Sequence, residues 1–180
     1  MISRDAWILF AIVLGGAGIL LGIVHRTRVG TVVRERIPNR QRRRLLLASV
    51  SFLVTFASVR VMVYCITHQI PPFHFIFMDG RHIHHLVFGI LLLLAVGYAW
   101  LCDIGTGMDS TSLLASRLTS ILYGLAAALT LDEFALWLNL KDVYWSREGR
   151  SSIDAVILFG SLLAIGAWGA PILTNRRGAK

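Results

Sequence analysis

The chain has 180 residues, of which 56% are hydrophobic and 16% are charged, and its mean hydropathy is +0.67. Soluble domains have about 45–50% apolar and about 25% charged residues. The composition therefore excludes an ordinary soluble domain and predicts an integral membrane protein. The apolar runs are unbroken and lack the alternation of a membrane β-barrel, so we expect a single all-α domain, 1–180, that forms a polytopic transmembrane helical bundle.

Five apolar segments predict five membrane spans. Each is close to the roughly 20 residues that an α-helix needs to cross the hydrocarbon core. The segments cover 6–24, 45–65, 84–102, 112–138 and 153–174. The fourth is interrupted by ionisable side chains, so we expect it to carry chemistry or a salt bridge.

Positive charge is concentrated in one connection. The net charge is +8, and the connection 25–44 contains eight arginines. Short loops rich in Arg and Lys remain on the cytoplasmic side, so five spans place the N-terminus outside and the C-terminus inside. The clustered arginines of this loop predict contact with anionic lipid head groups, and no nucleic-acid partner is expected.

Helix ends and helix contacts also leave signals in the sequence. Asp109 and its neighbours offer N-cap acceptors for the fourth helix, and Ser151 with Asp154 has the spacing of a capping box at the start of the fifth. Small residues allow helices to approach closely. In the first and fifth helices these are Gly15, Gly16, Gly18, Gly22, Gly160, Gly166 and Gly169.

Histidines cluster near the predicted outer ends of the second and third helices. Five of the six lie within eighteen residues, namely His68, His74, His82, His84 and His85. Residues three apart share a helix face, so His82 and His85 are expected to lie together. Gly89 is expected to leave space beside them, and His84 to point elsewhere.

Two adjacent carboxylates lie at the same predicted depth. Asp132 and Glu133 come near the outer end of the fourth helix, and Arg60 in the second helix belongs to the same layer. Neighbouring residues on a helix are about 100° apart, so only one carboxylate is expected to face the histidines. We predict that Glu133 shares the inward face with Thr130 and that Asp132 turns toward a neighbouring helix or the outer loop.

This polar layer predicts a metal site. Imidazole and carboxylate ligands suit zinc or iron, and a carboxylate that does not bind the metal can act as a general base on coordinated water. The candidate ligands are His82, His84, His85, Asp132 and Glu133, and His68, His74 or Asp79 are further candidates. Asp132 and Glu133 are also the candidate catalytic residues.

Two other interpretations of the layer remain open. Arg60 can neutralise Glu133 or Asp132 in a purely structural network, or the same groups can relay protons or a cation. The corresponding functions are a metal-dependent enzyme that acts on a lipid or membrane-soluble substrate, an accessory subunit of a larger membrane complex or homo-oligomer, and a transporter component.

The stretches GRHIHHLVFGI (80–90) and LDEFALWLNLKDVYW with GRSSIDAV (131–156) resemble an uncharacterised family of small bacterial polytopic membrane proteins. The resemblance implies no activity. It implies a multi-pass protein of the bacterial inner membrane.

Overall fold

The computed structural model describes residues 15–16, 18–19, 22–23, 26–37, 39–70, 77–78, 81–82, 84–140 and 149–168. The described part is helical, which confirms the predicted all-α class, apart from one antiparallel pairing of two residues with two. In chain order the elements are α2 (Arg28–Arg36), α3 (Arg40–Thr67), β1 (Phe77–Met78), β2 (Arg81–His82), α4 (His85–Leu101), α5 (Ser110–Asp132), α6 (Phe134–Asn139) and α7 (Arg150–Trp168).

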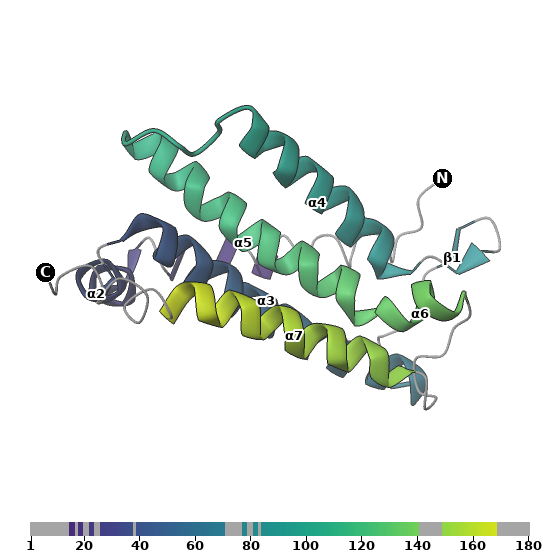
Figure 1. The fold of residues 1–180 in the computed structure, drawn as a ribbon. Helices are drawn as coiled ribbons and strands as arrows, with labels where there is room; N and C mark the ends of the chain where they lie inside the picture. The colour runs from purple at the N-terminus through teal and green to yellow at the C-terminus, as the bar shows by residue number, and fades with distance from the viewer. Residues whose placement is uncertain are drawn as a thin grey trace, which may run out of the picture.

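Four long helices form the bundle, and α5 is its centre. Helices α3, α4, α5 and α7 run in alternating directions, so the ends of α3 and α5 lie beside the beginnings of α4 and α7 (Figure 1). α5 packs against α3, α4 and α7, and α7 also packs against α3. In its most apolar window α5 is 61% buried, against 28% for α3 and 22% for α7.

Close helix approach depends on two glycines that face α5 or belong to it. A Cβ atom added to Gly124 of α5 would overlap the carbonyl oxygen of Ala48 in α3. One added to Gly89 of α4 would overlap Oγ1 of Thr130 in α5. The predicted space beside Gly89 is therefore wrong, because the backbone and side chain of α5 occupy it.

The glycines predicted to mediate packing behave differently in the two helices. In α7, a Cβ on Gly160 would lie 3.5 Å from Phe52, and one on Gly166 would lie 2.9 Å from Leu45, so both glycines face α3. Their predicted role in helix packing fits these contacts. Gly15, Gly16, Gly18 and Gly22 have no described atom within 4 Å of an added Cβ. Gly169 lies outside the described residues.

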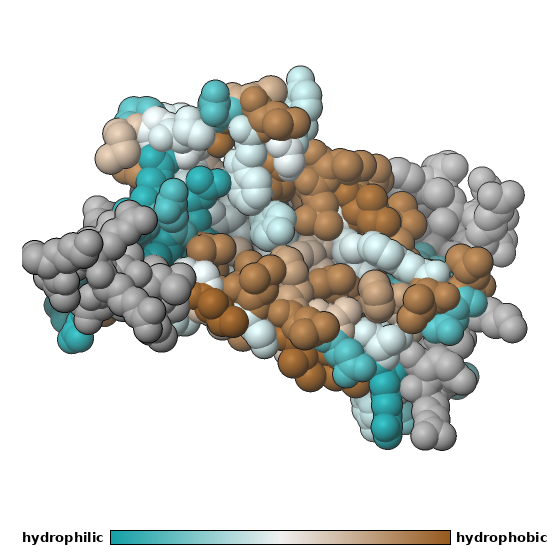
Figure 2. All heavy atoms as spheres, in the orientation of Figure 1, coloured by the Kyte–Doolittle hydropathy of each residue, from teal (hydrophilic) through white to brown (hydrophobic). Residues whose placement is uncertain are grey.

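The surface of the bundle suits a lipid environment. α3, α5 and α7 are long and apolar enough to cross a membrane, whereas α4 is apolar but has only 17 residues. Hydrophobic atoms cover the middle of the face in Figure 2, and hydrophilic atoms gather toward its ends. Exposed apolar side chains include Leu53, Val54, Val61, Leu91, Leu94, Ile157, Leu158, Leu162 and Ile165.

The predicted spans 45–65, 84–102 and 153–174 coincide with α3, α4 and α7 within a few residues at most ends. The first predicted span, 6–24, lies mostly outside the described residues. Five crossings and the orientation of the termini stay predictions.

Two predicted boundaries differ in the structure. The connection 25–44 is largely helical, since α2 occupies Arg28–Arg36 and α3 already begins at Arg40. Arginine is a good helix former, and the Asn39 side chain caps α3 by accepting the Arg42 N–H at 3.1 Å. Asp109 caps α5 in the same way, as predicted, by accepting the Ser112 N–H at 2.9 Å.

The second difference is a break in the predicted span 112–138. α5 ends at Asp132, Glu133 has φ −104° and ψ 24°, and α6 begins at Phe134. The break changes the direction of the Glu133 side chain, which then reaches the N-terminus of α4.

Gly124→Ala is expected to lower the midpoint of thermal unfolding of the purified protein. The added methyl group meets the α3 backbone, and overpacking of this kind costs about 1–3 kcal/mol. Gly160→Ala is the matched control, because its methyl group makes only an ordinary contact with Phe52. Alanine is the better helix former by up to about 1 kcal/mol, so the control should keep or raise the midpoint. Equal midpoints for the two variants would contradict the close approach of α3 and α5.

Candidate functional site

The candidate site lies at one end of the bundle, where α3 and α5 end and α4 and α7 begin (Figure 1). Helix ends leave backbone N–H and C=O groups without partners inside the helix. Side chains from three of these helix ends and the adjoining turn meet here. They are Arg60, His84, His85, Asp132 and Glu133.

Asp132 is the most buried carboxylate of the described residues. Its side chain has no exposed surface, and Oδ1 accepts a hydrogen bond from Arg60 Nε at 2.6 Å. The guanidinium also lies over the Phe56 ring, with its central carbon 5.1 Å from the centroid. A buried charge is costly unless it is paired, so Arg60 neutralises Asp132 and joins α3 to α5.

His85 lies against the same carboxylate. Its Nε2 atom is 3.2 Å from Asp132 Oδ2 and its Nδ1 atom is 3.7 Å from Glu133 Oε2. Nε2 is buried, but its direction does not meet the angles of a hydrogen bond to any described atom. His85 therefore lies between the two carboxylates and is held by proximity rather than by an aligned hydrogen bond.

Glu133 binds the start of α4 with both oxygens. Oε1 lies 2.7 Å from His84 Nδ1, and Oε2 accepts the backbone N–H of Leu86 at 2.9 Å. His84 is the N-cap residue of α4 and makes no side-chain cap of its own. Glu133 thus supplies the negative charge that a helix N-terminus favours, from a neighbouring helix end.

The predicted orientation of the histidines is wrong in two respects. His82 belongs to β2 and α4 begins at His85, so these two residues do not share a helix face. His84, expected to point elsewhere, contacts Glu133 because its extended backbone, with φ −77° and ψ 142°, precedes the helix.

The predicted orientation of the carboxylates is also wrong. Both Asp132 and Glu133 face the start of α4, because the helix ends between them and the 100° spacing no longer applies. Thr130, whose side chain is buried, packs against Gly89 instead of joining the ion pairs.

The other predicted site residues do not join this cluster in the described structure. His68 is exposed, its Nδ1 lies 2.9 Å from the Tyr64 carbonyl one turn earlier, and its ring stacks on Tyr64 at 4.0 Å. His74, Asp79 and the side chain of His82 lie outside the described residues.

Ser152 is a site residue that sequence reasoning missed. Its Oγ accepts the backbone N–H of Ala135 at 2.9 Å, and its side chain is buried at the start of α7. The contact satisfies an N–H at the start of α6, which the break at Glu133 creates. No local pattern reveals it, because the break itself is not visible in the sequence.

The described side chains do not by themselves form a metal site. Within the described ranges, no three His, Cys, Asp or Glu side chains are arranged to hold one ion. The predicted zinc or iron therefore depends on ligands from the segment that contains His74, Asp79 and His82.

Comparison of the chain with protein-family models, with curated proteins and with solved structures found no match. The function has to be argued from the site itself.

Asp132→Asn is expected to lower stability on the order of 3 kcal/mol, because it leaves the Arg60 guanidinium without its buried counter-charge. Thermal unfolding of the detergent-solubilised protein measures the change. The double variant Arg60→Met with Asp132→Leu should recover much of the loss, since neither charge then remains. Asp154→Asn, which changes an exposed carboxylate on α7, is the control. If the effects of Arg60→Met and Asp132→Leu, each made singly, add up to the effect of the double variant, Arg60 and Asp132 do not act as a pair.

Proposed function

We propose that the chain is a multi-pass protein of a bacterial inner membrane in which His84 and Glu133 form an acid–base pair of a membrane-embedded enzyme. The substrate is a lipid or another membrane-soluble molecule that reaches the outward end of the bundle. The supporting observation is the 2.7 Å contact between His84 Nδ1 and Glu133 Oε1, with the His84 side chain 21% exposed and that of Glu133 only 7% exposed.

This pair has the arrangement of an oriented general base. A carboxylate next to Nδ1 holds the neutral imidazole in the tautomer with its proton on Nδ1, which makes Nε2 the basic nitrogen. The same carboxylate stabilises the imidazolium that forms when Nε2 takes a proton. Since the Leu86 N–H fixes the other oxygen of Glu133, the pair is positioned before any substrate arrives.

The Arg60 and Asp132 pair has a positioning role in this proposal. Asp132 was a predicted catalytic residue, but its side chain is fully buried and is paired with Arg60. We therefore assign it no proton transfer. It keeps His85 and the end of α5 in place beside the proposed acid–base pair of His84 and Glu133. Glu133 retains its predicted catalytic role through His84.

A metal ion is compatible with the same geometry. Imidazoles that bind metals commonly donate their other N–H to a carboxylate, as His84 does to Glu133. Zinc or iron would take His84 or His85 together with ligands from the segment 74–82. Such a metal would supply the activation of a water molecule, and Glu133 would orient the His84 ligand.

Transport of protons through the bundle has less support. Between Thr130 and Ser120 the buried residues of α5 are all apolar, namely Ile121, Gly124, Leu125, Ala126, Ala127, Ala128 and Leu129. Ser120 donates its hydroxyl to the Ser116 carbonyl of the same helix at 2.7 Å. In the described helices the site is therefore separated from the opposite end by an apolar layer.

His84→Gln is expected to lower turnover strongly while leaving the fold intact, because glutamine keeps a hydrogen-bonding group beside Glu133 but cannot accept and return a proton. A lost general base typically lowers the rate by about 10²–10⁴-fold. The assay uses protein purified without chelator and placed in nanodiscs made from total bacterial lipid extract, with new products detected by mass spectrometry. Asp154→Asn is the matched control at the same end of the bundle.

Elemental analysis of the same samples separates the metal-dependent form from the metal-free form of the proposal. About one zinc or iron ion per chain, lost in His85→Ala, supports the first. Absence of any lipid conversion by the wild-type protein, with or without added zinc or iron, contradicts the enzyme. A stoichiometric large partner in that case favours an accessory subunit.

A further inference from the structure

The opposite end of the bundle carries a second polar cluster that the proposed function does not use. α3 begins with arginines, and no acidic residue lies in its first turn. Two of these arginines bind the carbonyl groups that end other elements. Arg42 Nε donates to the Ala167 carbonyl at 2.8 Å, and Arg43 Nη1 donates to the Ile37 carbonyl at 2.7 Å.

Arg40 holds the connection between α4 and α5. Its terminal nitrogens donate to the carbonyl oxygen of Gly105, to that of Thr106 at 2.9 Å and to that of Gly107 at 2.7 Å. These acceptors are uncharged. The Arg40 Nε–H is buried and has no hydrogen-bond partner in the described part of the chain.

Arg44 lies one helical turn after Arg40 and contacts Trp100. The central carbon of the Arg44 guanidinium is 5.1 Å from the centroid of the Trp100 ring at the end of α4. Arg44 is also close enough to Arg40 for the two positive charges to repel each other. The indole Nε1–H of Trp100 is a second buried donor without a partner among the described residues.

In the described part of the chain, no carboxylate forms an ion pair with Arg40 or Arg44. The four ion pairs between described side chains lie at the other end of the bundle. Asp109 lies in the neighbouring connection, but its side chain caps α5 through the Ser112 N–H. Positive side chains at a helix N-terminus are themselves unfavourable, which adds to the excess of positive charge.

We propose that Arg40, Arg44 and Trp100 form a binding site for the phosphate group of an anionic phospholipid. A phosphate offers acceptors to the two unpartnered N–H groups and a negative charge between two guanidiniums that otherwise repel. Tryptophan is favoured at the level of lipid head groups because its ring is apolar and its N–H is polar. The site lies at the arginine-rich end of α3, where that helix would leave the hydrocarbon.

A lipid is favoured over a soluble phosphate by the position of the donors. They belong to the ends of two apolar helices, α3 and α4, and large apolar side chains beside them, including Tyr98 and Leu101, are exposed. An acyl chain can cover these side chains while the head group binds the arginines. Soluble phosphate would leave the apolar surface uncovered.

The test compares phosphatidylglycerol with phosphatidylcholine. Full-length protein in neutral detergent is mixed with equal amounts of both lipids, and native mass spectrometry measures which one remains bound. Wild-type protein should retain phosphatidylglycerol in preference. Arg44→Gln should lower the preference about fivefold, the effect of about 1 kcal/mol per arginine near a lipid surface. Trp100→Phe keeps an aromatic ring but loses the indole N–H donor, and it should lower the preference as well.

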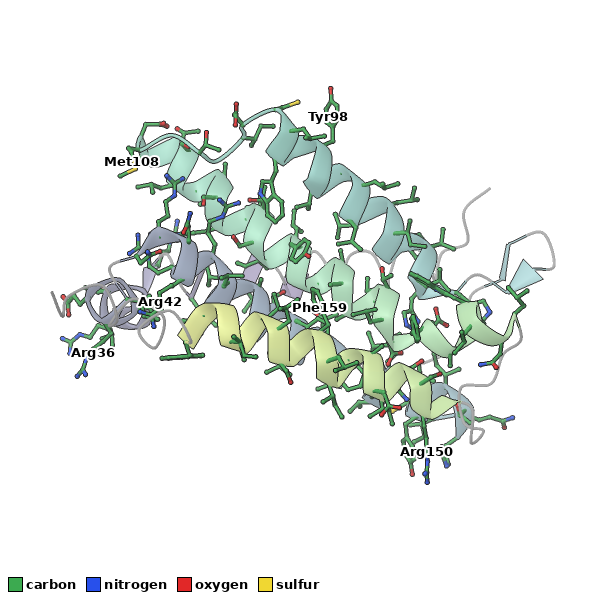
Figure 3. The ribbon with its side chains drawn as sticks, viewed as in Figure 1. Arg36, Arg42, Tyr98, Met108, Arg150 and Phe159 are labelled. Atoms are coloured by element: carbon green, nitrogen blue, oxygen red, sulfur yellow. The ribbon has the colours of Figure 1, made fainter. Side chains whose placement is uncertain are left out.

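Arg36→Gln is the matched control. Arg36 is exposed on α2 and points away from the bundle at the same end as Arg42 (Figure 3). The variant changes net charge by the same amount as Arg44→Gln and should keep the preference. Circular dichroism of each variant verifies the fold.

Three results would overturn the proposal. The first is an equal loss in Arg36→Gln and Arg44→Gln, which would show a general effect of charge. The second is an unchanged preference in Trp100→Phe. The third is thermal stabilisation by inorganic phosphate that depends on Arg44, without retention of phosphatidylglycerol, which would identify a soluble anion as the ligand.

Discussion

Asp132 is a carboxylate without exposed surface at the end of the central helix, and the structure around it depends on compensating that charge. Arg60 supplies the compensation from α3, at 2.6 Å, and His85 approaches the other oxygen from α4. A single buried charge therefore joins three helices at one level. The apolar contacts of α5 hold these helices side by side but do not prevent one helix from shifting along another. An ion pair joins two specific side chains and opposes such a shift. The ion pair of Arg60 with Asp132 therefore fixes the position of α3 relative to α5 along the bundle axis.

The break after Asp132 allows a second set of contacts at this end of the bundle. If α5 continued unbroken through Glu133, the two carboxylates would diverge by about 100° and only one could reach α4. Because the helix ends at Asp132, Glu133 turns to the N-terminus of α4 and holds His84 and the Leu86 N–H. The new start of α6 then needs a partner for the Ala135 N–H, and Ser152 of α7 provides it. One local departure from helical geometry thus connects three of the four long helices, α4, α5 and α7.

Much of the fold could be predicted because apolar length is a strong signal. Three predicted helices appear within a few residues, and Asp109 caps α5 as its sequence position suggested. Membership of the polar layer was also predictable, since Arg60, His85, Asp132 and Glu133 are ionisable groups at similar depth. Their directions were not. Both errors, His82 in place of His84 and one inward carboxylate in place of two, assumed that helical phase continues through residues where the helix has ended or has not begun. Such boundaries depend on contacts between distant parts of the chain, as with Glu133 and Leu86, 47 positions apart.

The two ends of the bundle place charges of opposite sign next to their helix N-termini. A helix N-terminus is polarised positively and favours an anion. At the site end, the chain provides that anion itself, because Glu133 reaches the start of α4. At the other end, the start of α3 receives only the uncharged Asn39 side chain, and its first turns add several arginines of the same sign as the helix dipole. Their described acceptors are neutral carbonyl groups at the ends of other elements, so they close the bundle without balancing its charge. Ion pairs between described side chains do not compensate the charge at this end, and the phospholipid that we propose as the ligand of Arg40 and Arg44 would supply a negative charge there.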